Sequence, residues 1–429
     1  MLEKEAVRPP LAKAGPVTDG DVTFGLVGQV QVLVRRWPGA ELVSATLAIR
    51  GGVQNVDARL AGVELVGLRT AASGGTERLA KDAFSKRLTK LGSTLEAGAA
   101  ADYSALEAKS LRADWEPSLS LLLDVFLHPA LPEAELALQR ERLLQELKRE
   151  QESPDDALHF LAEQLLFQGT PYAVRPQGTE DSVRALSLKD VQSHLGRLRA
   201  QNRLLLVVVG DVEPEAVFAL ARAALASLPE GEPLPPLPAP LHFERPRLVA
   251  ERRKLPTNYI LASFAGPSWG SPDFAAARLA VSVLSEHVFL EVRSRRNLSY
   301  APEVRLNTSR PQSFGGLYVS AVDPSVALPA MQGVVQELSA EPLPEEELRG
   351  EKAAFLVEFF LTQETTDGAG RRLVEAELLG GDWRLVRTLP ERIRRTTPKD
   401  VQAFVQKYVH GYQVAVVGNP DSVQLSLLQ

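Results

Sequence analysis

The sequence predicts an α+β protein built from two homologous α/β domains. Two observations support this fold class: a proline-rich stretch near the middle of the 429-residue chain, and short segments that recur on both sides of it. The stretch PEGEPLPPLPAPLHFERP, residues 229–246, holds too many prolines for a helix or a central strand and is typical of a semi-rigid linker. We therefore expect one domain over residues 22–228 and a second over residues 247–429.

The recurring segments keep the same order in both halves. SLKDVQSHL, followed by the apolar strand LLLVVVG, closes the first half, and TPKDVQAFV, followed by YQVAVVG, closes the second. The strands ATLAIRGG and ILASFAGP open the two halves. Three aligned pairs lie at offsets of 210, 208 and 215 residues: Asp190 and Asp400, Gly210 and Gly418, and Gly51 and Gly266. Internal similarity at a nearly constant offset indicates two copies of one unit.

The first half continues with a helix and a hairpin. SKRLTKLGSTLEAGAAADYSALEAKS predicts a helix that runs into two strands, because charged helix formers give way to glycine-containing turns and then to strand residues. A long helix rich in Leu, Glu and Arg is expected over residues 133–150.

The second half repeats this order. The segment 271–273 (SPD) offers an N-cap serine, a proline suited to the first turn, and an acid at the positive end of the helix dipole. The apolar run after it predicts a helix to about Arg295. YAPEVRLN and FGGLYVSAV then predict a hairpin, with Tyr300 at the start of its first strand, and a long helix follows over residues 345–365.

The composition excludes several classes of function. A net charge of −6 argues against a general nucleic-acid binder, and the absence of cysteine excludes disulfides, thiolate zinc sites and a cysteine nucleophile. No stretch is long and apolar enough to predict a membrane span, and MLEKEAVRPPLAKAGPVTDGD lacks the apolar core of a secretory signal. We expect a cytoplasmic location if the sequence is complete, and a periplasmic one if a signal has been trimmed.

The sequence gives only weak support for a zinc hydrolase or a serine hydrolase. A zinc hydrolase of the H-E-x-x-H or H-x-x-E-H type needs two histidines one turn apart on a helix. No two of the six histidines are that close in sequence: His128, His159, His194, His242, His287 and His410. GPSWG has the G-x-S-x-G form of a serine nucleophile at Ser268, but the helix signal begins too late for a nucleophile elbow. The corresponding turn of the first half, RGGVQN, has no serine.

The segment RSRRNLSY gathers three arginines and a tyrosine at the predicted end of a helix. In one interpretation the arginines complement the helix dipole and are otherwise solvated. In the other, Arg293 and Tyr300 converge on a carboxylate, since a guanidinium offers paired donors and a phenol adds a hydrogen bond without charge. The second requires the chain to fold back between the two residues.

The two-fold α/β repeat, the strand ending in VVGDVEPE, the segment QGTPYAVRPQGTEDSVRALSLKDVQSHL and the motif RSRRNLSYAP together resemble the pitrilysin/insulinase-type (M16) zinc peptidases, and most closely their short two-domain branch, M16B. The resemblance covers roughly residues 25–425. It implies that each domain has a mostly antiparallel sheet with helices, and that the chain forms half of a clam-shell.

The zinc motif of that family is degenerate in this sequence. Active members carry H-x-x-E-H on the first long helix, shortly before a Gly-Thr pair, and a glutamate further along as the third ligand. Anchored on the Gly-Thr of SGGT, the motif positions fall on Val66, Arg69 and Thr70, and Glu146 is the candidate relic of the third ligand. The resemblance thus implies that this chain binds no metal and has no independent activity.

The resemblance also implies a role for Arg293 and Tyr300, because paired members of the family use this arginine and tyrosine to hold a peptide. We therefore expect a catalytically inactive, substrate-binding subunit of a heterodimer. Zinc is expected in an M16B-type partner that carries H-x-x-E-H, with peptides or unfolded polypeptides as substrates. The alternatives are a purely structural core subunit of a larger complex, and a serine hydrolase that uses Ser268.

Overall fold

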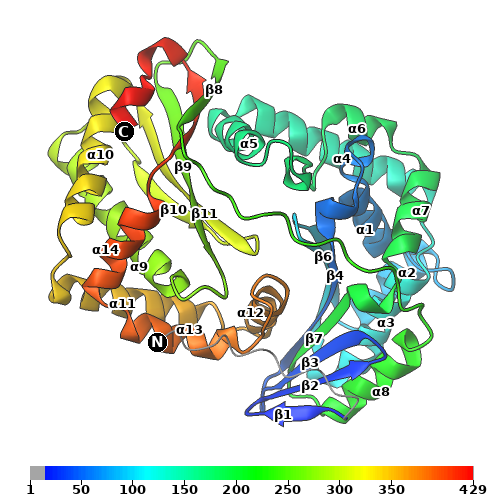
Figure 1. The fold of residues 1–429 in the computed structure, drawn as a ribbon. Coiled ribbons are helices and arrows are strands. Elements are labelled where there is room, and N and C mark those ends of the chain that lie inside the picture. The colour runs from blue at the N-terminus through cyan, green and yellow to red at the C-terminus, as the bar shows by residue number, and fades with distance from the viewer. Residues whose placement is uncertain (1–14, 429) are drawn as a thin grey trace. The chain divides into compact units, whose positions relative to one another are not determined.

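The computed structural model describes residues 15–428, so the first part of the N-terminal stretch in which no signal is expected lies outside it. The described chain forms two compact units, each assembled from three segments (Figure 1). Unit 1 comprises the chain up to Gln145, Val174–Pro236 and Thr362–Trp383. Unit 2 comprises Glu146–Ala173, Leu237–Leu361 and the chain from Arg384 onward.

Unit 1 contains a seven-stranded sheet in the order β1-β2-β3-β7-β4-β6-β5. Only β3 and β7 run parallel; every other neighbouring pair is antiparallel. The central β7 is buried along its whole length, as its continuous apolar sequence predicts. The strands are β1 Val17–Asp19, β2 Val22–Val27, β3 Val30–Arg36, β4 Leu42–Arg50, β5 Thr94–Ala99, β6 Tyr103–Leu111 and β7 Leu204–Gly210.

Helices cover both faces of this sheet. On one face, α1 packs on β5 and β6, α3 on β6 and α8 on β2 and β3, whereas α12 packs on β4 and β7 on the opposite face. The helices of unit 1 are α1 Val63–Gly74, α2 Lys81–Lys90, α3 Trp115–Leu127, α4 Glu133–Glu152, α6 Glu180–Ala185, α7 Leu188–Leu198, α8 Pro214–Leu225 and α12 Thr366–Leu378. The last turns of α4 belong to unit 2.

Unit 2 contains a five-stranded sheet in the order β10-β11-β9-β12-β8, in which only β12 and β8 run parallel. The strands are β8 Arg247–Arg252, β9 Asn258–Ser268, β10 Glu303–Asn307, β11 Gln312–Ala321 and β12 Gln413–Gly418. The helices are α5 Pro154–Leu166, α9 Phe274–Val288, α10 Pro324–Ala340, α11 Glu345–Leu361, α13 Leu385–Arg395 and α14 Pro398–Tyr408. No described helix is both long and apolar enough to cross a membrane.

The two sheets confirm that the chain holds two copies of one fold. The order β3-β7-β4-β6-β5 in unit 1 matches β8-β12-β9-β11-β10 in unit 2, and the parallel pair stands at the same place in both. Equivalent capping boxes start α7 and α14, with Ser187 and Asp190 in one and Thr397 and Asp400 in the other. The α+β class with two homologous halves is therefore as the sequence predicts.

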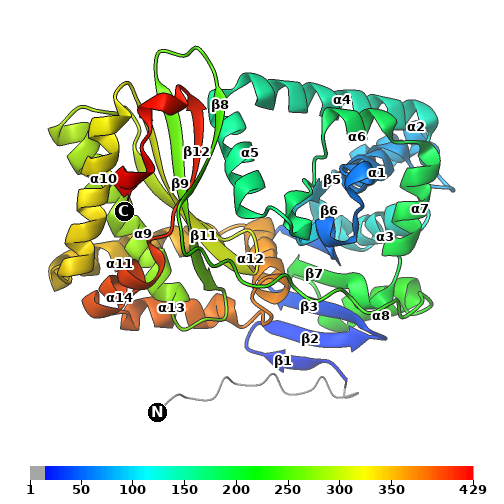
Figure 2. The same cartoon turned by 45° about the horizontal axis from the view of Figure 1, so that its top comes forward.

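Two helices are exchanged between the halves of the chain (Figure 2). The first half supplies α5, which packs on β8, β9 and β12 of unit 2, and the second half supplies α12, which packs on β4 and β7 of unit 1. The predicted ranges 22–228 and 247–429 follow the chain, whereas the compact units do not. Residues 229–246, all of them described, form neither helix nor strand, as their prolines require.

Two details of the second half differ from the sequence-based expectation. The helix after β9 begins at Phe274 rather than at Ser271, because the Ser271 hydroxyl accepts a hydrogen bond from Asp273 N in a local turn. The first hairpin strand begins at Glu303, so Tyr300 lies in the turn before it. The predicted helix end near Arg295 is correct, but its last segment, Phe289–Arg295, is a π-helix.

Candidate functional site

The chain folds back after the π-helix and brings Arg293 against Tyr300. The guanidinium carbon lies 4.6 Å from the centroid of the tyrosine ring, within the range of a cation–π interaction. Arg293 is partly buried, while Tyr300 is 78% exposed, so the pair is open to a ligand. Among the described residues, the guanidinium has one hydrogen-bond partner, Asn297, and the tyrosine hydroxyl has none. The donors of both side chains are therefore available.

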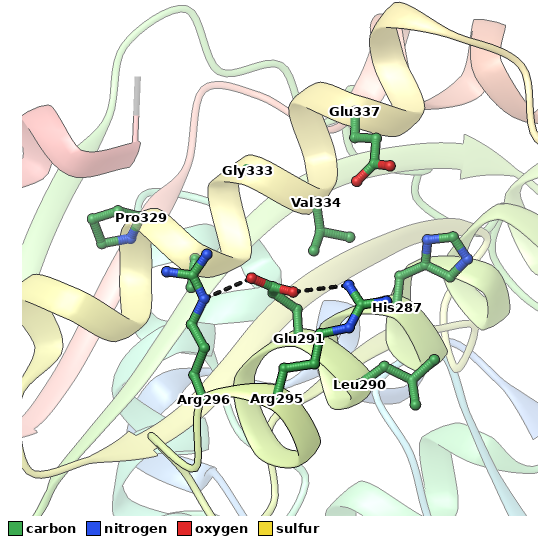
Figure 3. A pocket seen from close by; sticks show the side chains of 10 residues that line it. His287, Leu290, Glu291, Arg295, Arg296, Pro329, Gly333, Val334 and Glu337 are labelled. Carbon is green, nitrogen blue, oxygen red and sulfur yellow. Dashed lines mark hydrogen bonds and ion pairs between the residues drawn. The ribbon is translucent and has the colours of Figure 1, made fainter.

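The other two arginines of the segment are engaged elsewhere. Glu291 accepts hydrogen bonds from Arg296 Nε at 2.6 Å and from Arg295 Nη1 at 3.1 Å. These hydrogen bonds lower the pKa of the Glu291 carboxyl. All three side chains line a pocket of about 450 Å³ between the π-helix and α10, as Figure 3 shows. Of the three arginines, only Arg293 has no carboxylate partner among the described residues, so its charge is not already paired.

The positions of the family's zinc motif hold no metal-binding set. Val66 and Thr70 lie one turn apart on α1 and are fully buried. The Thr70 hydroxyl donates to the carbonyl oxygen of Val66 at 2.7 Å, which is a bond within the helix. A valine side chain has no ligand atom, and an arginine at position 69 is a cation that would repel a metal ion. The residues present therefore do not fit zinc.

Glu146 is partly buried on α4, at the first residue that belongs to unit 2. Within residues 15–428, no three His, Asp or Glu side chains are grouped so that they could hold a metal ion. A single carboxylate is a poor zinc site, because zinc takes three or four ligands in proteins.

A network of three buried polar residues lies beside the degenerate motif and was not predicted from the sequence. His194 on α7 lies 2.8 Å from Glu64 on α1, through Nε2 and Oε2, and Ser104 on β6 donates to the other carboxylate oxygen at 2.5 Å. All three residues are buried. The serine donates to the carboxylate rather than to the imidazole, so the order of a Ser-His-acid triad is absent. The network joins α1, α7 and the sheet, and its members are too far apart in sequence to form a motif.

Ser268 ends β9 and is exposed, and its backbone carbonyl accepts a hydrogen bond from Ser271 N at 3.0 Å. The next helix begins only at Phe274. A nucleophile elbow needs the serine at a sharp turn directly between strand and helix. The local geometry therefore does not support Ser268 as a nucleophile.

Two models of known protein families match this chain. The family model "Peptidase M16 inactive domain" matches residues 185–355, and the model "Insulinase (Peptidase family M16)" matches residues 31–176. Together the two models cover well over half of the chain. The first includes Arg293 and Tyr300, and the second includes Val66, Arg69 and Thr70.

The chain is also similar to individual proteins and to solved structures. The chain is 26% identical over 215 residues to cytochrome b-c1 complex subunit 1 of Bos taurus, a match that covers 49% of this chain and 45% of that one, so it spans less than half of this relative. It is 21% identical over 363 residues to the non-peptidase homolog YmxG of Helicobacter pylori, covering 80% of this chain and 82% of that one. A crystal structure of a peptidase M16 inactive domain from Pseudomonas fluorescens superposes with a TM-score of 0.83 at 18% identity, covering 93% and 98% of the two chains. The chain belongs to the M16 (insulinase) peptidase family.

Proposed function

We propose that this chain is the catalytically inactive, peptide-binding subunit of a heterodimeric M16-type peptidase. A partner subunit with an intact H-x-x-E-H motif would carry the zinc ion and the general base. The observation that supports the proposal most is the exposed pairing of Arg293 with Tyr300, both with available donors. The absence of histidine at positions 66 and 70, which hold Val66 and Thr70, supports a division of roles between two chains.

The chemistry of this pair suits the end of a peptide. A guanidinium binds a carboxylate through two parallel charge-assisted hydrogen bonds, and the tyrosine hydroxyl can add a neutral one. Holding one end of a peptide limits the positions that its scissile bond can take. A larger fraction of the bound peptides is then oriented for cleavage. When zinc is bound in the partner, it supplies an activated water and polarises the peptide carbonyl. No step of that chemistry falls to this chain.

A second candidate function is that of a structural subunit. The similarity to cytochrome b-c1 complex subunit 1 favours it, because that protein is a component of a larger complex by its name. This function needs no available donors on Arg293 and Tyr300. The same experiment therefore separates the two candidates.

The experiment is reconstitution of this chain with a zinc-bearing M16 subunit from the same source. We expect Arg293→Ala to lower kcat/KM for peptide cleavage by about 10- to 100-fold, since a hydrogen bond to a charged group contributes about 1.5–3 kcal/mol. Arg305→Ala is the matched control, because Arg305 is an exposed arginine on β10 whose Nε binds Glu303 at 2.7 Å. The control variant should keep the activity of the wild type.

Assembly must be measured in parallel by size-exclusion chromatography. A pair that assembles normally and cleaves peptides equally well with Arg293→Ala contradicts the peptide-binding role and favours the structural subunit. Tyr300→Phe separates the two contributions of the tyrosine. It keeps the ring under the guanidinium and removes only the hydroxyl, so we expect a loss of less than about 10-fold.

A further inference from the structure

Asn297 has an unusual backbone conformation for a residue other than glycine. Its φ of 52° lies in the left-handed region, which asparagine tolerates better than most side chains do. The backbone N–H of Asn297 donates to the carbonyl of Arg293 at 3.2 Å, and that of Leu298 donates to the carbonyl of Val292 at 2.9 Å. These bonds end the π-helix and reverse the chain, which returns Tyr300 to the side of Arg293.

The side chain of Asn297 makes a separate contact that the turn does not require. Its Oδ1 accepts a hydrogen bond of 2.9 Å from Nη1 of Arg293. The guanidinium is therefore fixed twice, by this bond and by the ring of Tyr300 at 4.6 Å. A glycine would satisfy the left-handed turn equally well or better, but it would leave Nη1 without an acceptor.

The bond to Asn297 leaves one edge of the guanidinium without a hydrogen-bond partner among the described residues. Nη1 is occupied, while Nε and Nη2 of Arg293 have no hydrogen-bond partner among the described residues. Nε and Nη2 share one edge of the planar group, and their parallel N–H bonds match the two oxygens of a carboxylate. An arginine held in this way needs little further ordering when the ligand arrives.

We propose that Asn297 is a positioning residue that presents the Nε–Nη2 edge of Arg293 to the terminal carboxylate of a bound peptide. This inference rests on the proposed function, because it assumes that Arg293 binds a peptide. It goes further by assigning one edge of Arg293 to the carboxylate and by adding a residue that acts through Arg293 without touching the ligand.

The test measures binding of one fluorescent peptide to the full-length chain, prepared with either a free C-terminal carboxylate or a C-terminal amide. The wild type should prefer the free acid. Asn297→Gly keeps the left-handed turn and removes the acceptor, and we expect the preference for the acid to fall by about 3- to 10-fold, which corresponds to an ordinary hydrogen bond. Asn297→Asp keeps the acceptor but places a competing carboxylate beside Arg293, and should lower acid binding further. Binding of the amide should not change in either variant.

The Arg293→Ala variant separates a failure of the positioning role of Asn297 from a failure of the proposed function. If it abolishes the acid preference while Asn297→Gly retains the full preference of the wild type, the positioning role is wrong and the proposed function stands. If Arg293→Ala has no effect on acid binding, both are wrong. A purely structural role for Asn297 would lower the melting temperature and weaken acid and amide binding alike, and that result would also overturn the inference.

Discussion

At the scale of single residues, Glu135 is a buried carboxylate of unit 1 that three side chains hold by hydrogen bonds. It is 3% exposed on α4 and accepts hydrogen bonds from Ser73 Oγ at 2.6 Å, Gln139 Nε2 at 2.8 Å and Lys81 Nζ at 2.5 Å. Burial by itself raises the pKa of a carboxyl, but the hydrogen bonds from Lys81, Ser73 and Gln139 overcome it and lower the pKa of Glu135 to about 2. The charged form is therefore the one that the fold requires.

This pKa predicts how stability depends on pH. A carboxyl whose pKa is lower in the folded state than its ordinary 4.5 stabilises the fold above that ordinary value, and loses the contribution as the pH falls toward about 2. We expect Glu135→Gln to lower the free energy of unfolding by roughly 3 kcal/mol at pH 7, and by much less at pH 3. Urea unfolding at the two pH values measures the difference. An equal loss at both would show that the charge of Glu135 is not responsible.

Residue chemistry also shows what the sequence could and could not predict about the site. Arg293 and Tyr300 stand out in the sequence because they are donors close together along the chain, whereas the degenerate positions are found only through the resemblance to the family. The role of Asn297 is invisible, since it depends on one dihedral angle and one hydrogen bond. The contact between Glu64 and His194 is equally invisible, because it joins helices far apart in sequence.

At the scale of elements, the loop between β10 and β11 is joined to α5 and the segment after it by one buried arginine. Arg310 is 5% exposed, and its guanidinium carbon lies 4.3 Å from the ring centroid of Phe167 and 4.7 Å from that of Tyr172. Nη2 donates to Glu163 at 3.1 Å, but Nε and Nη1 have no hydrogen-bond partner among the described residues. Burying unpaired donors opposes folding, whereas the contact with two rings favours it.

This balance predicts different changes in stability for two substitutions of Arg310. Arg310→Met removes the unpaired donors and keeps a long side chain against the two rings, so we expect a change in unfolding free energy within about 1 kcal/mol of the wild type, or a gain. Arg310→Ala leaves a cavity and should cost about 2–4 kcal/mol. Thermal and urea unfolding of the two variants provide the comparison. A methionine variant as unstable as the alanine variant would mean that the cation itself holds this part of unit 2 together.

The sequence predicted several helices and strands, among them the helices over residues 133–150 and 345–365, but it did not predict their packing partners. Hydrophobic periodicity indicates which face of α5 or α12 is buried, and it does not indicate which sheet buries it. The sequence pattern also did not predict that Phe289–Arg295 is a π-helix, because the wider hydrogen bonding of this segment depends on the turn that follows.

At the scale of the whole molecule, the exchange of α5 and α12 makes each unit depend on both halves of the chain. The apolar cluster around α5 shows this most clearly, because Ala157, Leu158 and Ala162 from the first half pack on Leu261 and Val417 from the second, and all five are buried. Neither half therefore contains a complete core. The linker at residues 229–246 is one of several places where the chain passes between units.

Cutting the linker should consequently leave the protein intact. We expect a variant with a specific protease site within residues 229–246 to give two fragments under denaturing electrophoresis and one peak, at the size of the uncut chain, in native size-exclusion chromatography. Each fragment still supplies one exchanged helix to the other's sheet, and burial of its apolar face holds the fragments together. Leu158→Asp, which places a charge at a fully buried position of that cluster, should release the fragments after cleavage. Separation of the unmodified fragments without denaturant would show that the exchanged helices contribute little.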